Sequence, residues 1–222
     1  MIGLVVSSIT ALVGTLMLLG GLALIAAHGF ARDDDGYYST DDERLSTSTY
    51  AISTDEIDLG ADPAGPAPED LLGTLRIRAE ATGGEPLFLG IGRTDAVERY
   101  LDGVRHARLT DFGGGRADYD EQPGGAPDRR PGAERFWVAE SQGAGERSVD
   151  WDVQTGVWTV ALMNADASRG IDADASVGIE ISWLIWVGVG LAVVGLLLAA
   201  TGVVLIIVLS RHAARDATPA PG

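Results

Sequence analysis

Two long stretches without a charged side chain constrain this chain most. Residues 2–27 and residues 183–209 contain no Asp, Glu, Lys or Arg. About 20 apolar residues span the hydrocarbon core of a bilayer, and neither stretch shows the polar stripe of a helix on a soluble core. We therefore expect two transmembrane helices, within residues 1–30 and 183–210, and a cytoplasmic tail at residues 211–222.

A cleaved signal peptide is the alternative for the first stretch. Ile25-Ala26-Ala27 before His28 is a tolerable cleavage site. A signal peptide usually has a basic segment followed by an apolar run of about 7–15 residues, whereas this run is longer and no basic residue precedes it. We favour a retained helix, and the sequence leaves cleavage open.

The placement of charge predicts an orientation. Arg211 and Arg215 follow the second stretch, and cytoplasmic flanks of membrane helices are enriched in basic residues. We expect a plasma-membrane protein with both termini in the cytoplasm and residues 31–182 outside. The lipid bilayer is then its first partner. Nucleic acid is not expected as a partner, because the net charge is −16 and phosphate backbones need a basic face.

Small residues recur every seven positions in both apolar stretches. They are Ser7, Gly14 and Gly21 in the first stretch, and Gly188, Gly195 and Gly202 in the second. Small residues allow close approach of two helices in lipid, so we expect the spans to pack antiparallel along these stripes. The alternative is that glycine and alanine are simply common in the spans of a GC-rich organism. No Asp, Glu, Lys or Arg lies inside either stretch, so a channel or pump is not expected.

The region between the spans predicts an acidic juxtamembrane stalk at residues 31–44 and a β domain at residues 45–182. Segments rich in β-branched residues or with alternating polarity occupy residues 46–54, 73–81, 86–92, 104–112, 135–141, 147–153, 157–164 and 171–182. Gln154-Thr155-Gly156 predicts a hairpin between two of them, and the Gly- and Pro-rich residues 113–134 predict a mobile loop. The expected fold class is two transmembrane helices flanking an extracytoplasmic, mainly antiparallel β-sandwich with one short helix.

The segment "LFLGIGRTDAVERYL" at residues 87–101 has the outline of a nucleotide-binding turn. A dinucleotide fingerprint needs a third glycine, but Asp95 occupies that position, and a Walker loop needs a lysine, which the chain lacks. A structural corner is favoured instead. Asp95 as N-cap and Glu98 three residues later would cap a short helix, with Val97 and Leu101 facing the sheet.

Other candidate chemistry is weak. The histidines at positions 28, 106 and 212 do not assemble a zinc site or a triad, no cysteine is present, and Asp33–Asp35 read as a solvated charge run. The segment "NADASRGIDAD" (164–174) suggests calcium. It departs from the EF-hand pattern, because Arg169 stands where Gly is needed and Ala175 where Glu is needed. We predict no cofactor and no metal, with a looser calcium turn left open.

Several segments resemble a group of uncharacterised two-span membrane proteins from high-GC Gram-positive bacteria. They are "LRIRAE", "PLFLGIGRTDAVERYLDGV", "FWVAE" and "VDWDVQTGVWTVALMNADASRGIDADASVGIEI". Outer domains of the group look similar, with a Gly-Ile-Gly turn, a helix containing Tyr-Leu, a Phe-Trp strand and a Met-Asn-Ala-Asp turn. The resemblance covers most of residues 73–210 and implies architecture only.

The predicted function is non-catalytic: binding, scaffolding or regulation of another envelope or membrane protein. The alternatives are an envelope hydrolase and a calcium- or carbohydrate-binding sensor. An enzyme should show a pocket with converging polar groups, whereas a docking module should show an exposed apolar or aromatic patch. Trp137, Trp151 and Trp158 are the aromatic residues to examine, with core packing as the alternative role.

Overall fold

The structure, a computed structural model, describes residues 2–30, 32, 35–59, 73–112, 117–180 and 183–216. The chain divides into two compact units: residues 1–32 with 182–222, and residues 33–181. The first is the helical unit and the second is the β unit. Residues 60–72, and residues 217–222 of the predicted tail, lie outside the described residues.

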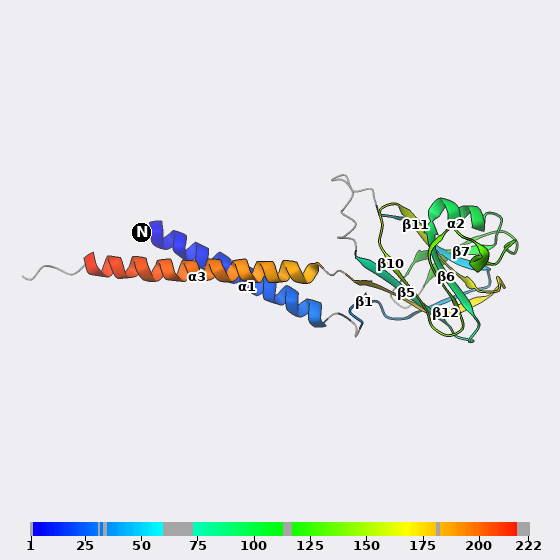
Figure 1. Cartoon of the computed structure of the whole chain (residues 1–222), viewed down its shortest axis with the longest axis horizontal. Helices are drawn as coiled ribbons and strands as arrows, with labels where there is room; N and C mark the ends of the chain where they lie inside the picture. The colour runs from blue at the N-terminus through cyan, green and yellow to red at the C-terminus, as the bar shows by residue number, and fades with distance from the viewer. Residues whose placement is uncertain are drawn as a thin grey trace, which may run out of the picture. The chain divides into compact units, whose positions relative to one another are not determined.

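The helical unit consists of α1 (Ile2–Phe30) and α3 (Leu184–Asp216), which cross in Figure 1. Both helices are long and apolar enough to cross a membrane, as predicted. Their contacts run in opposite directions along the chain, because Gly21 meets Gly188 and Gly14 meets Gly195. The two helices therefore form an antiparallel pair.

The β unit contains two open sheets, and the prediction of a mainly antiparallel β domain with one short helix is confirmed. The first, called sheet A, contains β1 (Tyr38–Ser39), β2 (Glu43–Thr47), β5 (Thr74–Ala81), β10 (Arg147–Asp152) and β12 (Ile171–Glu180). The second, called sheet B, contains β3 (Ala51–Thr54), β4 (Ile57–Asp58), β6 (Leu87–Arg93), β7 (His106–Asp111), β8 (Asp118–Gln122), β9 (Trp137–Gly143) and β11 (Val157–Asn164). Of the described pairs, β3 with β7 is parallel.

Sheet order positions the edges of the sandwich. In sheet A, β12 lies between β5 and the short strands β1 and β2, and β10 forms the other edge. In sheet B, β8 and β9 are the two edges. Strands β9 and β10 follow one another in the chain and contact each other, so they close one side. The edges β2 and β8 therefore lie on the opposite side, and no described ladder joins them.

The short helix α2 (Thr94–Leu101) covers the outer face of sheet B (Figure 1). Val97 and Leu101 are buried, as their i and i+4 spacing predicts. They join a cluster that includes Phe88 and Met163. Sheet B thus packs on both faces, which explains why β6 is buried at every position except Arg93.

Two strand predictions are wrong, because in each case consecutive strands belong to different sheets. Residues 46–54 were expected as one strand, but β2 belongs to sheet A and β3 to sheet B. The chain crosses between them at Thr49, whose buried hydroxyl donates to the Ala51 carbonyl. The Gln154–Gly156 turn likewise joins β10 in sheet A to β11 in sheet B, so it connects two layers and forms no hairpin.

Two regions predicted to be loose carry regular structure. Residues 38–44 of the predicted stalk contain β1 and the start of β2, because both extend sheet A along β12. Residues 117–134 of the predicted loop contain β8 and a turn of 3-10 helix, Pro131–Ala133, whose Pro131 is buried. Composition misled the prediction here, since edge strands tolerate polar and acidic residues. Residues 113–116 lie outside the described residues.

The Gly-Ile-Gly motif is not a turn. Gly90 and Gly92 lie inside β6, paired with β11 on one side and β9 on the other. A Cβ on Gly90 would lie 2.8 Å from the ring of Trp137, and one on Gly92 would lie 2.9 Å from Val97. Glycine is needed at both positions because aromatic side chains and α2 pack directly on the strand.

Candidate functional site: an apolar cavity between the sheets

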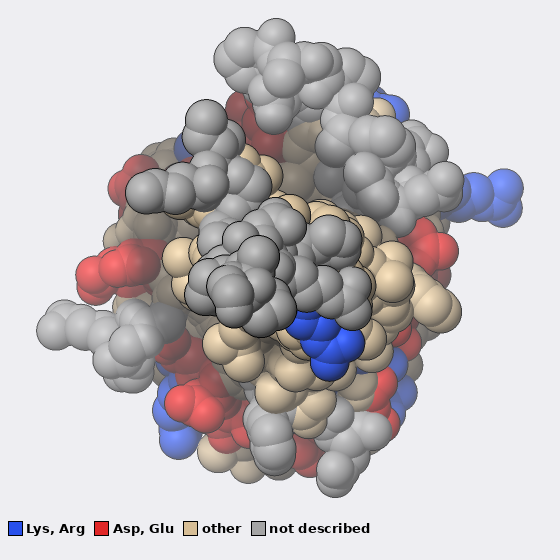
Figure 2. Space-filling model, turned by 90° about the vertical axis from the view of Figure 1, so that its left-hand side faces the viewer, with Lys and Arg blue, Asp and Glu red and all other residues tan. Residues whose placement is uncertain are grey.

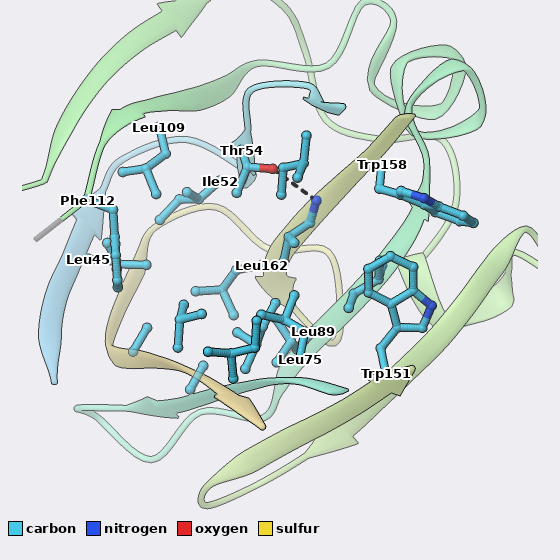
Figure 3. Close-up of a pocket in the computed structure, with 18 of the residues that line it drawn as sticks. Leu45, Ile52, Thr54, Leu75, Leu89, Leu109, Phe112, Trp151, Trp158 and Leu162 are labelled. Atoms are coloured by element: carbon cyan, nitrogen blue, oxygen red, sulfur yellow. Dashed lines mark hydrogen bonds between the residues drawn. The ribbon is translucent and has the colours of Figure 1, made fainter. Parts of the chain in front are cut away.

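A cavity of about 470 Å³ lies between the two sheets (Figure 3). Folded cores are close-packed, with few voids larger than a water molecule. Ligand pockets typically enclose about 300–1,000 Å³. The space is therefore too large for an ordinary packing defect and falls within the size range of a ligand site.

Buried aliphatic side chains from both sheets form the floor of the cavity. Strand alternation turns Leu89 and Ile91 of β6 and Leu162 of β11 inward from sheet B. Ile77 and Ala79 of β5 face them from sheet A. These side chains are branched or small hydrocarbons, so the floor offers dispersion contacts and no hydrogen bonds.

The cavity lies at one end of the sandwich, which we call the cavity end. Ile179 of β12 pairs with Leu75 of β5 there, and Trp158 of β11 pairs with Ile57 of β4. All four side chains line the cavity, and Ile57, Leu75 and Ile179 are only half-buried. Tyr38, where β1 begins, also pairs with Ile179. The chain thus enters and leaves the β unit at the cavity end.

Two tryptophans form one wall. The rings of Trp151 and Trp158 meet at 4.9 Å between centroids, edge to face, and join sheet A to sheet B. Trp158 is 2% exposed, and its indole N–H donates to the Gln154 carbonyl at 2.9 Å. The N–H of Trp151 is buried without a partner. Figure 3 shows this pair on one side of the cavity and Leu45, Leu109 and Phe112 on the other.

One polar side chain, Thr54, is among the residues that line the cavity. Its hydroxyl oxygen accepts the Val160 backbone N–H at 3.1 Å (Figure 3). The hydroxyl proton stays available to a ligand. Because no second polar side chain converges with Thr54 among the described lining residues, the cavity suits an apolar chain better than a reaction that moves protons.

The outer face of sheet A is, by contrast, covered with ion pairs. Arg76 pairs with Asp150 and with Asp35, and Arg44 pairs with Asp172 at 2.6 Å. The hydrogen bond from Arg76 holds the pKa of Asp150 below its ordinary value, with burial opposing the shift and the charge of Arg76 adding to it. Figure 2 shows red side chains at several places around the molecule, with blue side chains beside some of them. Acidic side chains outnumber arginines among the described residues of this face, so the ion pairs neutralise only part of its negative charge.

A second hollow, polar and open, lies beside α2 and contains His106. The Nδ1 atom of His106 is 2.9 Å from the Val104 carbonyl, so the ring is held by its own backbone. The hydroxyls of Thr94 and Thr159 bond to each other at 2.9 Å. No hydroxyl or carboxylate of the described residues bonds to His106, so the hollow presents no nucleophile–base pair.

The small residues predicted for helix packing lie at the contact between α1 and α3. A Cβ on Gly14 would lie 2.7 Å from the Gly195 carbonyl oxygen, and one on Gly21 would lie 2.6 Å from that of Gly188. A Cβ on Gly202 would meet Ala11 at 2.7 Å. Ser7, at the start of the same stripe, is buried. A side chain at Gly14, Gly21 or Gly202 would push the helices apart.

The predicted helix cap is wrong. Helix α2 starts at Thr94, its N-cap is Arg93, and no side chain caps it. Asp95 therefore lies in the first turn, where its carboxylate accepts from Arg99 at 2.9 Å, and Glu98 is exposed. Helix α2 follows β6 directly after Arg93, so it begins two residues earlier than an N-cap at Asp95 would require. A carboxylate in the first turn still favours the helix dipole.

The described residues include no group of three or more His, Cys, Asp or Glu side chains arranged to hold a metal ion. In the 164–174 turn, Asn164 donates to Ser168 and Gly170, and Asp166 accepts the Ser168 backbone N–H at 2.9 Å. These groups stabilise the turn itself. Asp33, Asp34 and the side chains of His28 and His212 lie outside the described residues.

The cavity was not predicted from the sequence. Trp151 and Trp158 were predicted as aromatic residues to examine, and both lie in the wall of the cavity. Residues 171–182 were also predicted as a strand, and Val177 and Ile179 of that strand line the cavity. Nothing in one strand reveals how far apart two sheets lie, so the empty space carried no sequence signal.

No protein-family model and no curated protein matches the chain. The resemblance to two-span membrane proteins of high-GC Gram-positive bacteria therefore stays a prediction, and the function must be argued from the site.

Proposed function

We propose that this chain is a membrane-anchored, non-catalytic binding protein whose β unit holds the acyl chain of a lipid. The observation that carries the proposal is the cavity of about 470 Å³, with its aliphatic floor, tryptophan wall and single lining hydroxyl. An unfilled apolar cavity forfeits dispersion contacts on every lining side chain. An acyl chain restores those contacts and removes its own apolar surface from water.

The surface of the β unit favours this function over docking of a protein. Among the described residues of the β unit, Val138 is the one large hydrophobic side chain classed as exposed, at 47%. A docking module should instead present a contiguous apolar patch. Trp151 and Trp158 are buried, and Trp137 is half-buried in the cluster under α2. The aromatic residues thus serve the interior.

The two helices anchor the protein in the membrane in this proposal. We place both helices across the plasma membrane, with the termini in the cytoplasm and residues 31–182 outside, because Arg211 and Arg215 follow the second apolar stretch. Strand β12 ends at Glu180 and α3 begins at Leu184. Few residues of chain therefore separate β12, which lines the cavity, from the second apolar helix.

Native mass spectrometry of the full chain, released from nanodiscs of defined lipid, tests the proposal. Ala175 lines the cavity and is buried, so Ala175→Phe should fill the space. We expect wild type to retain one tightly held lipid that Ala175→Phe loses, at unchanged or higher thermal stability.

Ala144→Leu is the matched control, since Ala144 is exposed in the turn between β9 and β10. It should retain the lipid as wild type does. Equal lipid retention by wild type and a folded Ala175→Phe would contradict the proposal, because the lipid would then be held by the helices.

A further inference from the structure

Two buried polar atoms without hydrogen-bond partners lie beside the cavity. They are Oε1 of Glu43, in a residue only 5% exposed, and the hydroxyl oxygen of Tyr119. Buried polar groups in folded proteins are almost always paired, so each exception requires an explanation. We call Glu43 and Tyr119 the polar corner.

Strand register places the polar corner on the cavity side of both sheets. Glu43 in β2 pairs with Ala175 in β12, and Tyr119 in β8 pairs with Leu109 in β7. Ala175 and Leu109 both line the cavity. Directly paired residues project from the same face of a sheet, with Cβ atoms about 4.5–5.5 Å apart. Both polar side chains therefore face the space between the sheets, beside the cavity lining.

The two groups also lie within electrostatic reach of each other. Burial raises the pKa of Tyr119, the neighbouring Ser46 backbone, which lies outside hydrogen-bond geometry, partly lowers it, and the charge of Glu43 raises it again. They belong to the edge strands β2 and β8, which no described ladder joins. The polar corner thus lies at the side of the sandwich that backbone hydrogen bonds leave open.

The chemistry of the polar corner selects a head group. A carboxylate only accepts hydrogen bonds, whereas a phenol both donates and accepts. An anionic head group would meet repulsion from Glu43, and a plain hydrocarbon would leave both atoms unpaired at a cost. A hydroxyl group satisfies both, because it can donate to the carboxylate and accept from the phenol.

We propose that the lipid bound in the cavity is a single-chain, uncharged lipid with a hydroxyl-bearing head group of the monoacylglycerol type. Its head group bonds to Glu43 and Tyr119, and its acyl chain runs from the side of Leu45 and Phe112 toward Trp151 and Trp158. This inference rests on the proposed function and specifies which lipid the cavity takes.

The test compares two ligands with the same acyl chain, monooleoylglycerol and oleic acid. The full chain is held in an amphipathic polymer, and each ligand displaces a fluorescent polyene monoacylglycerol at pH about 8, where a carboxylic acid is ionised. We expect wild type to bind monooleoylglycerol about tenfold or more tightly than oleic acid, since one hydrogen bond to a charged group accounts for that ratio.

Glu43→Gln should reduce this preference to about threefold or less, because an amide can donate to the oleate carboxylate. Tyr119→Phe is a second variant, and it should weaken monooleoylglycerol more than oleic acid. Glu80→Gln is the matched control: Glu80 is exposed in β5 of the same sheet, and its replacement removes the same charge away from the cavity. That variant should keep the wild-type preference.

The outcomes separate this inference from the proposed function. Equal binding of the two ligands to wild type, or the same loss of preference in Glu80→Gln as in Glu43→Gln, would overturn the head-group assignment and leave lipid binding standing. Failure of wild type to bind either ligand would overturn the proposed function, and this inference with it.

Discussion

The two faces of sheet B are packed differently. On the outer face, Phe88 and Met163 are fully buried under α2, beside Trp137. On the inner face, Leu89 and Leu162, their neighbours in the same strands, border an open space. One pair of strands, β6 and β11, thus carries a filled face and an unfilled face. On the outer face α2 and Trp137 cover these strands, whereas on the inner side the rings of Trp151 and Trp158 form a wall beside the cavity and do not fill it.

Truncation of one side chain on each face should give the largest difference in stability between the two faces. Met163→Ala should lower the free energy of unfolding by about 3–5 kcal/mol, because a fully enclosed side chain leaves a new void. Leu162→Ala should cost about 2–3 kcal/mol, since part of that side chain already faces empty space and has fewer contacts to lose. Denaturant unfolding of the full chain in an amphipathic polymer measures both. Equal costs would mean that the inner face is packed.

Enlarging a side chain should have opposite effects on stability on the two faces of sheet B. Gly90→Ala should destabilise by about 1–3 kcal/mol, because its Cβ would lie 2.7 Å from Phe88 and 2.8 Å from Trp137. Ala175→Phe, which enters the cavity, should leave the melting temperature unchanged or raise it. A thermal melt of the two variants decides the point, and a large loss of stability in Ala175→Phe would show that the space cannot accept a ring.

The paired tryptophans allow a finer comparison inside the cavity wall. Trp158→Phe removes the hydrogen bond to the Gln154 carbonyl and should cost about 1 kcal/mol beyond the lost ring area. Trp151→Phe removes an N–H that has no partner, so it should cost less. The same unfolding titration measures both. A larger loss for Trp151→Phe would reveal a hydrogen bond that the structure does not contain.

The smallest effect is expected on the outer face of sheet A. Because Arg76 lowers the pKa of Asp150 in the folded state, this pair stabilises the fold above the unfolded pKa of about 3.9 and loses that contribution as the pH falls through the folded value. The Asp150 side chain is 48% exposed, so screening limits the gain to below about 1 kcal/mol. Asp150→Asn should be slightly less stable than wild type near neutral pH and equal to it in acid. A constant difference at all pH values would refute the assignment.

Sequence patterns predicted elements whose signal lies within one segment. Alternation from Ile171 to Glu180 gave β12, and the long uncharged stretches gave α1 and α3. Predictions were wrong where the structure of a segment depends on another segment that packs against it. Gly90 and Gly92 were interpreted as a turn because the rings and the helix that require them come from other segments. Asp95 was interpreted as a cap because a turn was expected between the strand and the helix, whereas α2 follows β6 directly. The turn at Gln154–Gly156 read as a hairpin, although β10 and β11 find partners in different sheets.

The candidate site was harder to predict than the fold for the same reason. Glu43 lies in a run of polar and acidic residues that read as a solvated stalk, and only its pairing with Ala175 turns it inward. Tyr119 lies in a Gly- and Pro-rich region that read as a loop. Their common position at the open side of the sandwich depends on two ladders that join residues far apart in the chain.

The central place of β12 in sheet A also sets an order for biosynthesis. β1, β2 and β5 are made early, yet each takes its ladder from β12, near the end of the β unit. Sheet A therefore cannot be completed until the ribosome has passed Glu180, and α3 begins only a few residues later. Contacts between residues so distant in the chain form slowly, so the edges of β5 and β6 stay unpaired through most of translation. On the proposed membrane topology, folding of the β unit and release of α3 into the bilayer must then occur close together in time.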